Sequence, residues 1–361
     1  MASSRERIVI VGAGIIGLNV ALVLAQRGVG DQITVAAEHH PGDTAPSYTS
    51  PWAGCNFSAI SGRDENALRW DKKGYAHLSS LAATDSSKTF VRETESIEYW
   101  DDDVPEEKIQ DMSEYLKNFR ILPPSELPEG VKFGVAFTTL TLNAPNHLKY
   151  LYERLQKEYG VRFVRKVVSD IRDPFSNPKT KIVFNCVGNR AKTLLGVEDS
   201  RCYPTRGQVL LARAPHVHIN VMRHGRGYET YIIPRPESNG CVILGGYMQK
   251  GNRSLNLWDS DSSTYASEAD SIIERTTALS PELSKHSFET LAAFSGLRPS
   301  REGGARIERT DIDVAGHTRI IVHNYGAGGT GFQAGYGMAT ESVDTINDVL
   351  KQWSSKSSAK L

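Results

Sequence analysis

Three segments with different hydrophobic periodicity follow one another between residues 7 and 37. Residues 7–11 form a short, continuous apolar run that predicts a buried strand. Residues 12–27 place apolar side chains at helical spacing, and Gly28 supplies the stop expected at the end of a helix. Residues 33–37 predict a second strand. A strand, a helix and a strand within this length predict two parallel strands joined by a right-handed crossover.

The rest of the chain repeats both kinds of pattern. Helical periodicity predicts helices over residues 65–81, 143–159 and 263–279, and a last one from Gly331 to about Trp353. Apolar runs predict strands at residues 161–168, 181–186, 207–212, 231–234, 241–247 and 319–323. We therefore expect an α/β protein, in which a Rossmann-like dinucleotide-binding domain is interleaved with a β-rich (α+β) substrate-binding domain. The expected boundaries are 1–64, 145–200 and 285–353 for the first domain, 65–144 and 201–284 for the second, and 354–361 for a flexible tail.

Composition and charge narrow the function classes. The 42 basic residues balance the 42 acidic ones, so no nucleic acid partner is indicated. The four cysteines have no CxxC spacing, so we expect neither a zinc site nor a disulfide framework, and we expect no metal. The apolar run that ends at Gly12 is too short for a signal-peptide core or a membrane span.

A glycine motif lies between the first strand and the first helix. Gly12, Gly14 and Gly17 fit G-x-G-x-x-G, in which the glycines permit a tight turn, a close approach of the pyrophosphate and close helix–strand packing. The helix N-terminus then offers free N–H groups and a partial positive charge to the phosphates. Glu38, at the end of the second strand, is placed to accept hydrogen bonds from the adenosine ribose hydroxyls. The motif does not separate FAD from NAD, because both contain the same ADP half.

A second glycine-rich turn decides between the two dinucleotides. Residues 323–331 follow a predicted strand and precede the last helix, so their backbone N–H groups would also face the ligand. FAD oxidases carry such a turn against the flavin ring, where its dipoles stabilise negative charge on the reduced flavin. We therefore expect FAD. An NAD-dependent dehydrogenase and a nucleotide-binding module without catalysis are the more distant alternatives.

With these residues in view, the chain resembles the D-amino-acid oxidase family, which includes D-aspartate oxidase. The resemblance runs from Arg7 to about Glu341 and is closest to fungal members. The motifs that carry it are Gly12–Gly17, Ser50-Pro51-Trp52-Ala53-Gly54, Asn185-Cys186-Val187-Gly188, Arg206-Gly207-Gln208, Tyr231-Ile232-Ile233-Pro234, Gly245-Gly246, Gly296-Leu297-Arg298-Pro299-Ser300-Arg301 and His323–Gly331.

The resemblance implies a reaction and a cofactor site. The reaction is hydride transfer from the α-carbon of a D-amino acid to flavin N5, giving an α-keto acid, ammonia and, from O2, H2O2. The implied cofactor contacts are Gly12, Gly14, Ile15, Ile16, Gly17, Glu38, His39, Ser50, Ala53, Gly54, Val167, Cys186, Gly188, Arg298, Gly326, Gly328, Gly329, Thr330, Gly331, Phe332 and Gln333.

The resemblance also implies catalytic residues. Arg298 would clamp the substrate carboxylate through its planar guanidinium, and the hydroxyl of Tyr231 would reach the same carboxylate. Gly329 would accept the substrate amine through its carbonyl, and Gln333 would lie near the flavin and the amine. The second active-site tyrosine departs from the family pattern: Tyr228 is favoured, with Tyr247 as the alternative.

The preferred substrate depends on which side chains point into the pocket. Asn56 and Met222 are expected to contact the substrate side chain, and Met222 pointing inward would favour neutral D-amino acids. Arg223 or Arg226 pointing inward would instead select D-aspartate. Because arginines on such a loop are more often solvated, a broad enzyme that prefers neutral side chains is favoured over D-aspartate oxidase.

The end of the sequence concerns location. Ala359-Lys360-Leu361 is a near match to the Ser-Lys-Leu peroxisomal address, so we expect a peroxisomal import receptor as a partner and the peroxisomal matrix as the location. The insertion that pairs some yeast members head to tail is absent between Arg309 and Arg319, which leaves a homodimer open.

Overall fold

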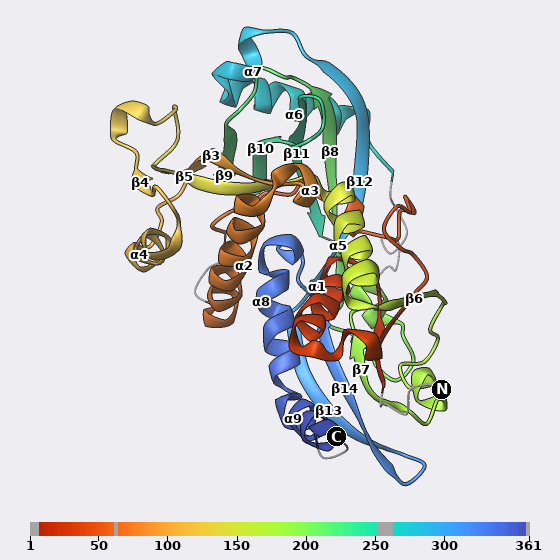
Figure 1. Cartoon of the computed structure of the whole chain (residues 1–361). Helices are drawn as coiled ribbons and strands as arrows, with labels where there is room; N and C mark the ends of the chain where they lie inside the picture. The colour runs from red at the N-terminus through yellow and green to blue at the C-terminus, as the bar shows by residue number, and fades with distance from the viewer. Residues whose placement is uncertain (1–6, 61–63, 251–262, 359–361) are drawn as a thin grey trace.

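A computed structural model describes residues 7–60, 64–250 and 263–358, and its strands form two sheets (Figure 1). The first sheet lies in the half of the molecule that also holds both ends of the chain. The second sheet forms the other half. The polypeptide passes between the two sheets several times, so the domains are interleaved, as the sequence predicts.

The first sheet has six strands and carries the predicted βαβ unit. In spatial order the strands are β13 (Arg306–Val314), β14 (His317–Tyr325), β7 (Thr180–Asn185), β1 (Arg7–Val11), β2 (Ile33–Ala37) and β6 (Arg162–Arg165). Every neighbouring pair is parallel except β13 with β14, which form an antiparallel hairpin. Side chains of β1 are buried on both faces, because helices cover one side and a long connection covers the other.

Four helices pack around this sheet. They are α1 (Ile15–Leu24), α5 (Ala144–Tyr159), α8 (Gly331–Asp344) and α9 (Asn347–Ser358). Nearly every residue of α1 is buried, since the helix lies between the sheet and its helical neighbours α5 and α8. Apolar side chains from residues 168–197 cover the opposite face.

The second sheet has eight strands. In spatial order they are β12 (Glu289–Arg301), β8 (Cys202–Arg213), β11 (Cys241–Lys250), β10 (Tyr228–Pro234), β9 (Asn220–Gly225), β3 (Val91–Trp100), β5 (Phe133–Leu142) and β4 (Arg120–Ile121). Helices α6 (Ala266–Leu279) and α7 (Pro281–Lys285) bury apolar residues against one face. The other face carries a smaller apolar cluster that includes Met222 and Tyr231.

Helix α2 (Glu65–Thr84) lies beside α8 (Figure 1). Two glycines allow their backbones to approach closely. A Cβ on Gly74 would lie 2.9 Å from the carbonyl carbon of Gln333, and one on Gly337 would lie 2.6 Å from Cα of Trp70. The start of α8 is thereby held against the second domain. The short helix α3 (Ser86–Thr89) follows α2, and α4 (Glu106–Tyr115) connects β3 to β4.

Several boundaries differ from those expected. Residues 285–353 are not all part of the first domain, because β12 pairs with β8 along its whole length and the chain returns to the first sheet only at β13. The last predicted helix is two helices, and α9 extends to Ser358, beyond the expected start of a flexible tail at residue 354. The tripeptide Ala359-Lys360-Leu361 lies outside the described residues. No helix among the described residues is long and apolar enough to cross a membrane.

Candidate active site

A cavity of about 660 Å³ lies between the two sheets. Its lining includes the residues that follow β1, β2, β7 and β14, namely Gly12, Glu38, Cys186 and Gly326. The carboxyl ends of parallel strands meet at one edge of a sheet, and ligands of such folds bind there. The inner face of the second sheet closes the cavity through Tyr231 and its neighbours.

One end of the cavity is the N-terminus of α1. Gly12 has a φ of +110°, which favours glycine, and a Cβ there would lie 2.9 Å from the carbonyl carbon of Cys186. Gly14 begins the helix without a capping side chain, and no acidic residue stands in the first turn. Ser50 Oγ accepts the N–H of Ile15 at 3.0 Å. Backbone N–H groups and the positive end of the helix dipole are therefore available to an anion in the cavity.

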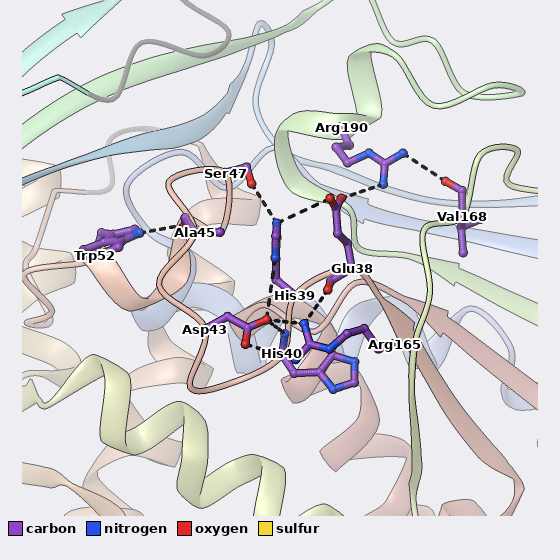
Figure 2. A network of polar contacts seen from close by, with 10 residues as sticks. All are labelled: Glu38, His39, His40, Asp43, Ala45, Ser47, Trp52, Arg165, Val168 and Arg190. Carbon is purple, nitrogen blue, oxygen red and sulfur yellow. Dashed lines mark hydrogen bonds and ion pairs between the residues drawn. The ribbon is translucent and has the colours of Figure 1, made fainter.

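A second part of the cavity surrounds Glu38 (Figure 2). One carboxylate oxygen lies 3.6 Å from Arg190 Nη1, and the other lies 3.9 Å from Nε2 of His39. Arg165 Nη1 donates to the backbone carbonyl of Glu38 at 2.8 Å and also pairs with Asp43. Burial is slight here, and the hydrogen bond from Arg165 lowers the pKa of Asp43 to about 2. These contacts fix the loop after β2 and leave Glu38 at the cavity wall.

Strand β12 and the second glycine-rich turn meet at the far side of the cavity. The N–H of Gly328 donates to the carbonyl of Pro299 at 2.9 Å, and Ser300 forms an isolated bridge with Ala327. A Cβ on Gly329 would lie 3.7 Å from Nε of Arg298. The expected carboxylate clamp and the expected amine acceptor are thus brought together.

Arg298 is also held from the first domain. The carbonyl of Leu297, the residue before it, accepts hydrogen bonds from Thr49 Oγ1 and Asn189 Nδ2, both at 2.8 Å. Nη1 of Arg298 is buried and has no hydrogen-bond partner among the described residues. A buried guanidinium nitrogen without a partner is costly, so it is suited to receive an anionic group of a ligand.

Tyr231 stands beside Arg298. Its ring fits over two glycines: a Cβ on Gly245 would lie 2.7 Å from the Tyr231 hydroxyl oxygen, and one on Gly246 would lie 2.9 Å from it. Burial raises the pKa of Tyr231, while the charge of Arg298 opposes that rise. A neutral hydroxyl and a guanidinium therefore face the same part of the cavity.

The substrate-pocket residues predicted from the sequence also lie in the lining. Asn56 and Met222 both line the cavity, and Nδ2 of Asn56 lies 3.0 Å from the Met222 sulfur. Gln333 lines it too, but its amide is already engaged: Nε2 donates to Asp71 at 3.0 Å and to the carbonyl of Ser58 at 3.1 Å. Gln333 therefore positions the 56–58 segment.

Tyr228 is not placed where the sequence predicted. Residues three apart on a strand point to opposite faces, so Tyr228 lies on the face of β10 opposite Tyr231. Its hydroxyl donates to Asp101 at 2.6 Å, and the residue does not line the cavity. The alternative, Tyr247, is absent from the lining as well. Neither candidate for the second active-site tyrosine therefore lines the cavity.

Three expected cofactor contacts also lie outside the lining: Gly17, Val167 and Thr330. Gly17 packs against the turn, where a Cβ would lie 3.0 Å from the carbonyl carbon of Gly12. Val167 is half exposed, whereas its neighbours Lys166 and Val168 line the cavity. The hydroxyl of Thr330 donates to the carbonyl of Ala327 at 2.9 Å and so closes the turn. The other expected contacts all line the cavity.

Sequence reasoning missed several residues of the site. Tyr48, whose hydroxyl donates to the carbonyl of Ala13 at 2.7 Å, supports the phosphate turn. Gly207 lies under the Arg298 guanidinium, where a Cβ would be 2.6 Å from Cζ. Glu229 lines the cavity two positions before Tyr231 on the same strand face. The period-2 alternation of β10 was the signal that could have found Glu229.

A family model described as FAD dependent oxidoreductase matches residues 7–345. The chain belongs to this family. It is 44% identical over 342 residues to a D-amino-acid oxidase of Schizosaccharomyces pombe, covering 93% of this chain and 94% of that protein. It is 29% identical to a D-aspartate oxidase of Cryptococcus neoformans var. grubii, over 94% and 96% of the two chains. The crystal structure of glycine oxidase from Geobacillus kaustophilus matches with a TM-score of 0.72 at 18% identity, covering 96% and 95%.

The FAD-dependent oxidoreductase family confirms the prediction of FAD over NAD. The residues present fit this cofactor. The open N-terminus of α1 beside Gly14 suits the pyrophosphate, and Glu38 suits the ribose hydroxyls. The turn at residues 326–331 brings a second open helix start, since α8 also begins without a side-chain cap or an acidic first turn. The part of the cavity between these two helix starts and Arg298 would hold the flavin end of the cofactor.

Proposed function

We propose that the protein catalyses the oxidative deamination of D-amino acids to α-keto acids, ammonia and H2O2. The observation that carries the proposal is the buried Nη1 of Arg298 beside Tyr231, which has no hydrogen-bond partner in the described part of the chain, in a protein 44% identical to a D-amino-acid oxidase. In the reaction the amino acid loses a hydride from its α-carbon and a proton from its nitrogen. Water then hydrolyses the imine to the keto acid and ammonia. When bound, FAD supplies the two-electron acceptor and passes the electrons to O2.

The protein's own residues bind and orient the substrate. The guanidinium of Arg298 and the hydroxyl of Tyr231 hold the α-carboxylate, because an arginine fork donates two parallel hydrogen bonds to it. The carbonyl of Gly329, next to Arg298, accepts from the amine. Fixing the carboxylate and the amine orients the α-carbon and leaves the side chain to project toward Asn56 and Met222. A nucleotide-binding module without catalysis would have no use for such a carboxylate clamp.

We further propose that neutral D-amino acids are preferred to D-aspartate. Arg223 and Arg226, the arginines that could have selected an acidic side chain, pair instead with Asp101 and Asp102. Arg223 lies on the strand face opposite Met222, because adjacent residues of a strand alternate between faces. Met222 therefore occupies the inward position. D-aspartate oxidase activity remains the alternative, since two of the relatives carry that name.

The proposal is tested by the reductive half-reaction without O2. Holoenzyme mixed anaerobically with D-alanine should lose its oxidised-flavin absorbance, whereas L-alanine should leave it unchanged. Arg298→Ala should remain yellow and require a far higher D-alanine concentration for the same loss. Persistence of the oxidised spectrum with every D-amino acid tried would overturn the proposal.

We also propose that the terminal tripeptide Ala359-Lys360-Leu361 directs the enzyme to peroxisomes. The support is the motif together with a peroxide-producing reaction. A fluorescent protein carrying the last residues of this chain should enter peroxisomes, and removal of the tripeptide should leave it in the cytosol. Uniform distribution of the unaltered fusion would refute this location.

A further inference from the structure

Glu229 and Tyr231 share one face of strand β10. Both line the cavity, whereas Tyr228 and Thr230 point to the opposite face. Two residues along a strand advance the chain by about 7 Å. The backbone position of Glu229 is therefore about that far along β10 from Tyr231, whose hydroxyl is proposed to hold the substrate's α-carboxylate.

The Glu229 carboxylate belongs to a buried cluster. Its Oε2 lies 2.8 Å from Nδ1 of His224, and Nε2 of the same ring lies 3.2 Å from Oε2 of Glu98. Ser58 Oγ donates to Glu98 Oε2 at 3.1 Å. The side chain of Glu98 is fully buried and that of His224 is 9% exposed, while that of Glu229 is 32% exposed. Glu229 is thus the charged member of the cluster that reaches the cavity.

The charge of the cluster follows from these contacts. A histidine that donates from both ring nitrogens to carboxylates must be protonated. Burial opposes the protonated form, but the hydrogen bonds to Glu229 and Glu98 outweigh it and raise the pKa of His224 to about 9. Two carboxylates and one imidazolium leave one negative charge. Oε1 of Glu229 accepts no hydrogen bond from the described residues, so the negative charge has a free acceptor at the cavity.

Nearby cations do not cancel this charge within the cavity. Arg275 lies behind the sheet, where it donates to Thr230 Oγ1 at 2.7 Å. Lys108 lies over the Trp100 ring and feels the charges of Glu98, Asp71 and Glu229, but it does not line the cavity. Two cationic residues of the second sheet line the cavity, Arg298 and Lys250. Lys250 is exposed and lies at the end of β11, where its backbone is in register with Thr205 of β8.

We propose that Glu229 determines specificity: it admits D-amino acids with basic side chains, such as D-lysine, beside neutral ones, and it rejects D-aspartate and D-glutamate. The inference rests on the proposed function, because it takes the α-carboxylate to lie on Arg298. A four-carbon side chain that ends in an ammonium group would project along the face of β10 and reach Oε1 of Glu229. An acidic side chain in the same place would meet a carboxylate of the same sign.

Two pairs of substrates isolate the effect of charge: D-norleucine is D-lysine without its terminal ammonium group, and D-glutamine is isosteric with D-glutamate. D-lysine is compared with D-norleucine, and D-glutamate with D-glutamine, by peroxide release from holoenzyme. In Glu229→Gln the kcat/KM ratio of D-lysine to D-norleucine should fall tenfold or more, and the ratio of D-glutamate to D-glutamine should rise. Asp102→Asn removes an acidic charge that pairs with the exposed Arg226, and it should leave both ratios unchanged. Unchanged ratios in Glu229→Gln would overturn the inference. A wild-type preference for D-glutamate over D-glutamine that is lost in Lys250→Met would also overturn it, because Lys250 would then select the side chain.

A binding experiment keeps the inference separate from the proposed function. 6-Aminohexanoate is D-lysine without its α-amine, and hexanoate also lacks the terminal ammonium. Their dissociation constants are measured from the perturbed flavin spectrum. The wild-type enzyme should prefer 6-aminohexanoate, and Glu229→Gln should lose that preference. If no D-amino acid gives peroxide yet this preference holds, the proposed function fails and cation recognition by Glu229 stands. An equal preference in both proteins would refute the role of Glu229 whatever the enzyme oxidises.

Discussion

The guanidinium of Arg298 lies directly over Gly207: a Cβ at residue 207 would be 2.6 Å from Cζ and 2.7 Å from Nη2. Strands β12 and β8 pair Arg298 with Thr205, so the arginine reaches diagonally across the strand pair to the space over Gly207. The missing side chain at residue 207 therefore sets where the guanidinium can lie. The Arg-Gly-Gln motif on β8 owes its glycine to this contact.

Gly207→Ala should displace the guanidinium without removing its charge. Because a shift of about 1 Å in a positioning group costs up to about a hundredfold in rate, KM for D-alanine should rise by roughly ten- to a hundredfold. FAD content should not change, since residue 207 faces the clamp. Steady-state kinetics measure the KM, and the flavin-to-protein absorbance ratio measures the FAD content. An unaltered KM would mean that Arg298 does not hold the substrate.

The two tyrosines of β10 should respond differently to loss of their hydroxyls. Tyr231→Phe removes a hydrogen bond to a charged carboxylate, worth about 1.5–3 kcal/mol, so kcat/KM should fall by roughly ten- to a hundredfold. Tyr228→Phe removes only the bond to Asp101, which keeps its 2.8 Å contact with Arg223. Its kcat/KM should stay within about twofold, with a stability loss of about 1 kcal/mol. A large kinetic effect at Tyr228 would restore it as the second active-site tyrosine.

Glu38 should matter for retention of FAD. Loss of its hydrogen bonds to the ribose in Glu38→Ala should weaken FAD binding by on the order of tenfold, or about 1.4 kcal/mol. Asp102→Asn is the control, because it also removes a carboxylate, and Asp102 lies outside the cavity lining and pairs with the exposed Arg226. Titration of apoprotein with FAD gives both dissociation constants. Equal affinities for the wild type and Glu38→Ala would remove Glu38 from the cofactor site.

A buried ion pair should make stability depend on acid pH. Asp199 Oδ2 lies 2.7 Å from Arg301 Nε and accepts from the hydroxyl of Tyr325 at 2.9 Å. Burial disfavours the carboxylate, but these hydrogen bonds outweigh it and lower the pKa of Asp199 from 3.8 to about 2. Because the pKa of Asp199 is lower in the folded protein than in the unfolded chain, the ionised carboxylate stabilises the fold at pH values above its unfolded pKa. This stabilisation is present above pH 3.8 and is lost as the pH falls toward 2.

Asp199→Asn tests that pair. Breaking a buried ion pair leaves Arg301 uncompensated and should cost about 3–5 kcal/mol of unfolding free energy at neutral pH. Melting temperatures of the wild type and the variant should converge as the pH is lowered from about 5 toward about 3, where the aspartate begins to gain its proton. A difference in Tm that does not vary with pH over that interval would contradict the account.

The sequence predicts the parts of the fold that local patterns determine. The apolar runs at residues 7–11 and 33–37, with the glycines between them, are β1, the start of α1 and β2. Strand β12 was assigned to the wrong domain because its residues, at the edge of the second sheet, are mostly exposed or half-exposed and have no strong apolar pattern. Only its pairing with β8 shows where it belongs, and that pairing joins residues about a hundred positions apart.

In the candidate site, too, local motifs were predictable from the sequence, whereas contacts between distant segments were not. Gly12, Gly14 and Arg298 were predictable because short motifs carry their roles. Tyr228 was misplaced because a motif gives spacing along the chain, whereas the face of a strand decides what a side chain meets. Glu229 and Gly207 were missed because their roles depend on partners from other strands, His224 and Arg298.

The measurement that tests the central claim most directly is peroxide release in air from purified holoenzyme, with ammonia and keto acid measured alongside. Neutral D-amino acids such as D-alanine and D-methionine should give H2O2, ammonia and keto acid in equal amounts, and the L-isomers should give none. D-aspartate should be oxidised at least tenfold less efficiently than D-methionine, judged by kcat/KM. Absence of peroxide from every D-amino acid, with a yellow and fully loaded enzyme, would contradict the account.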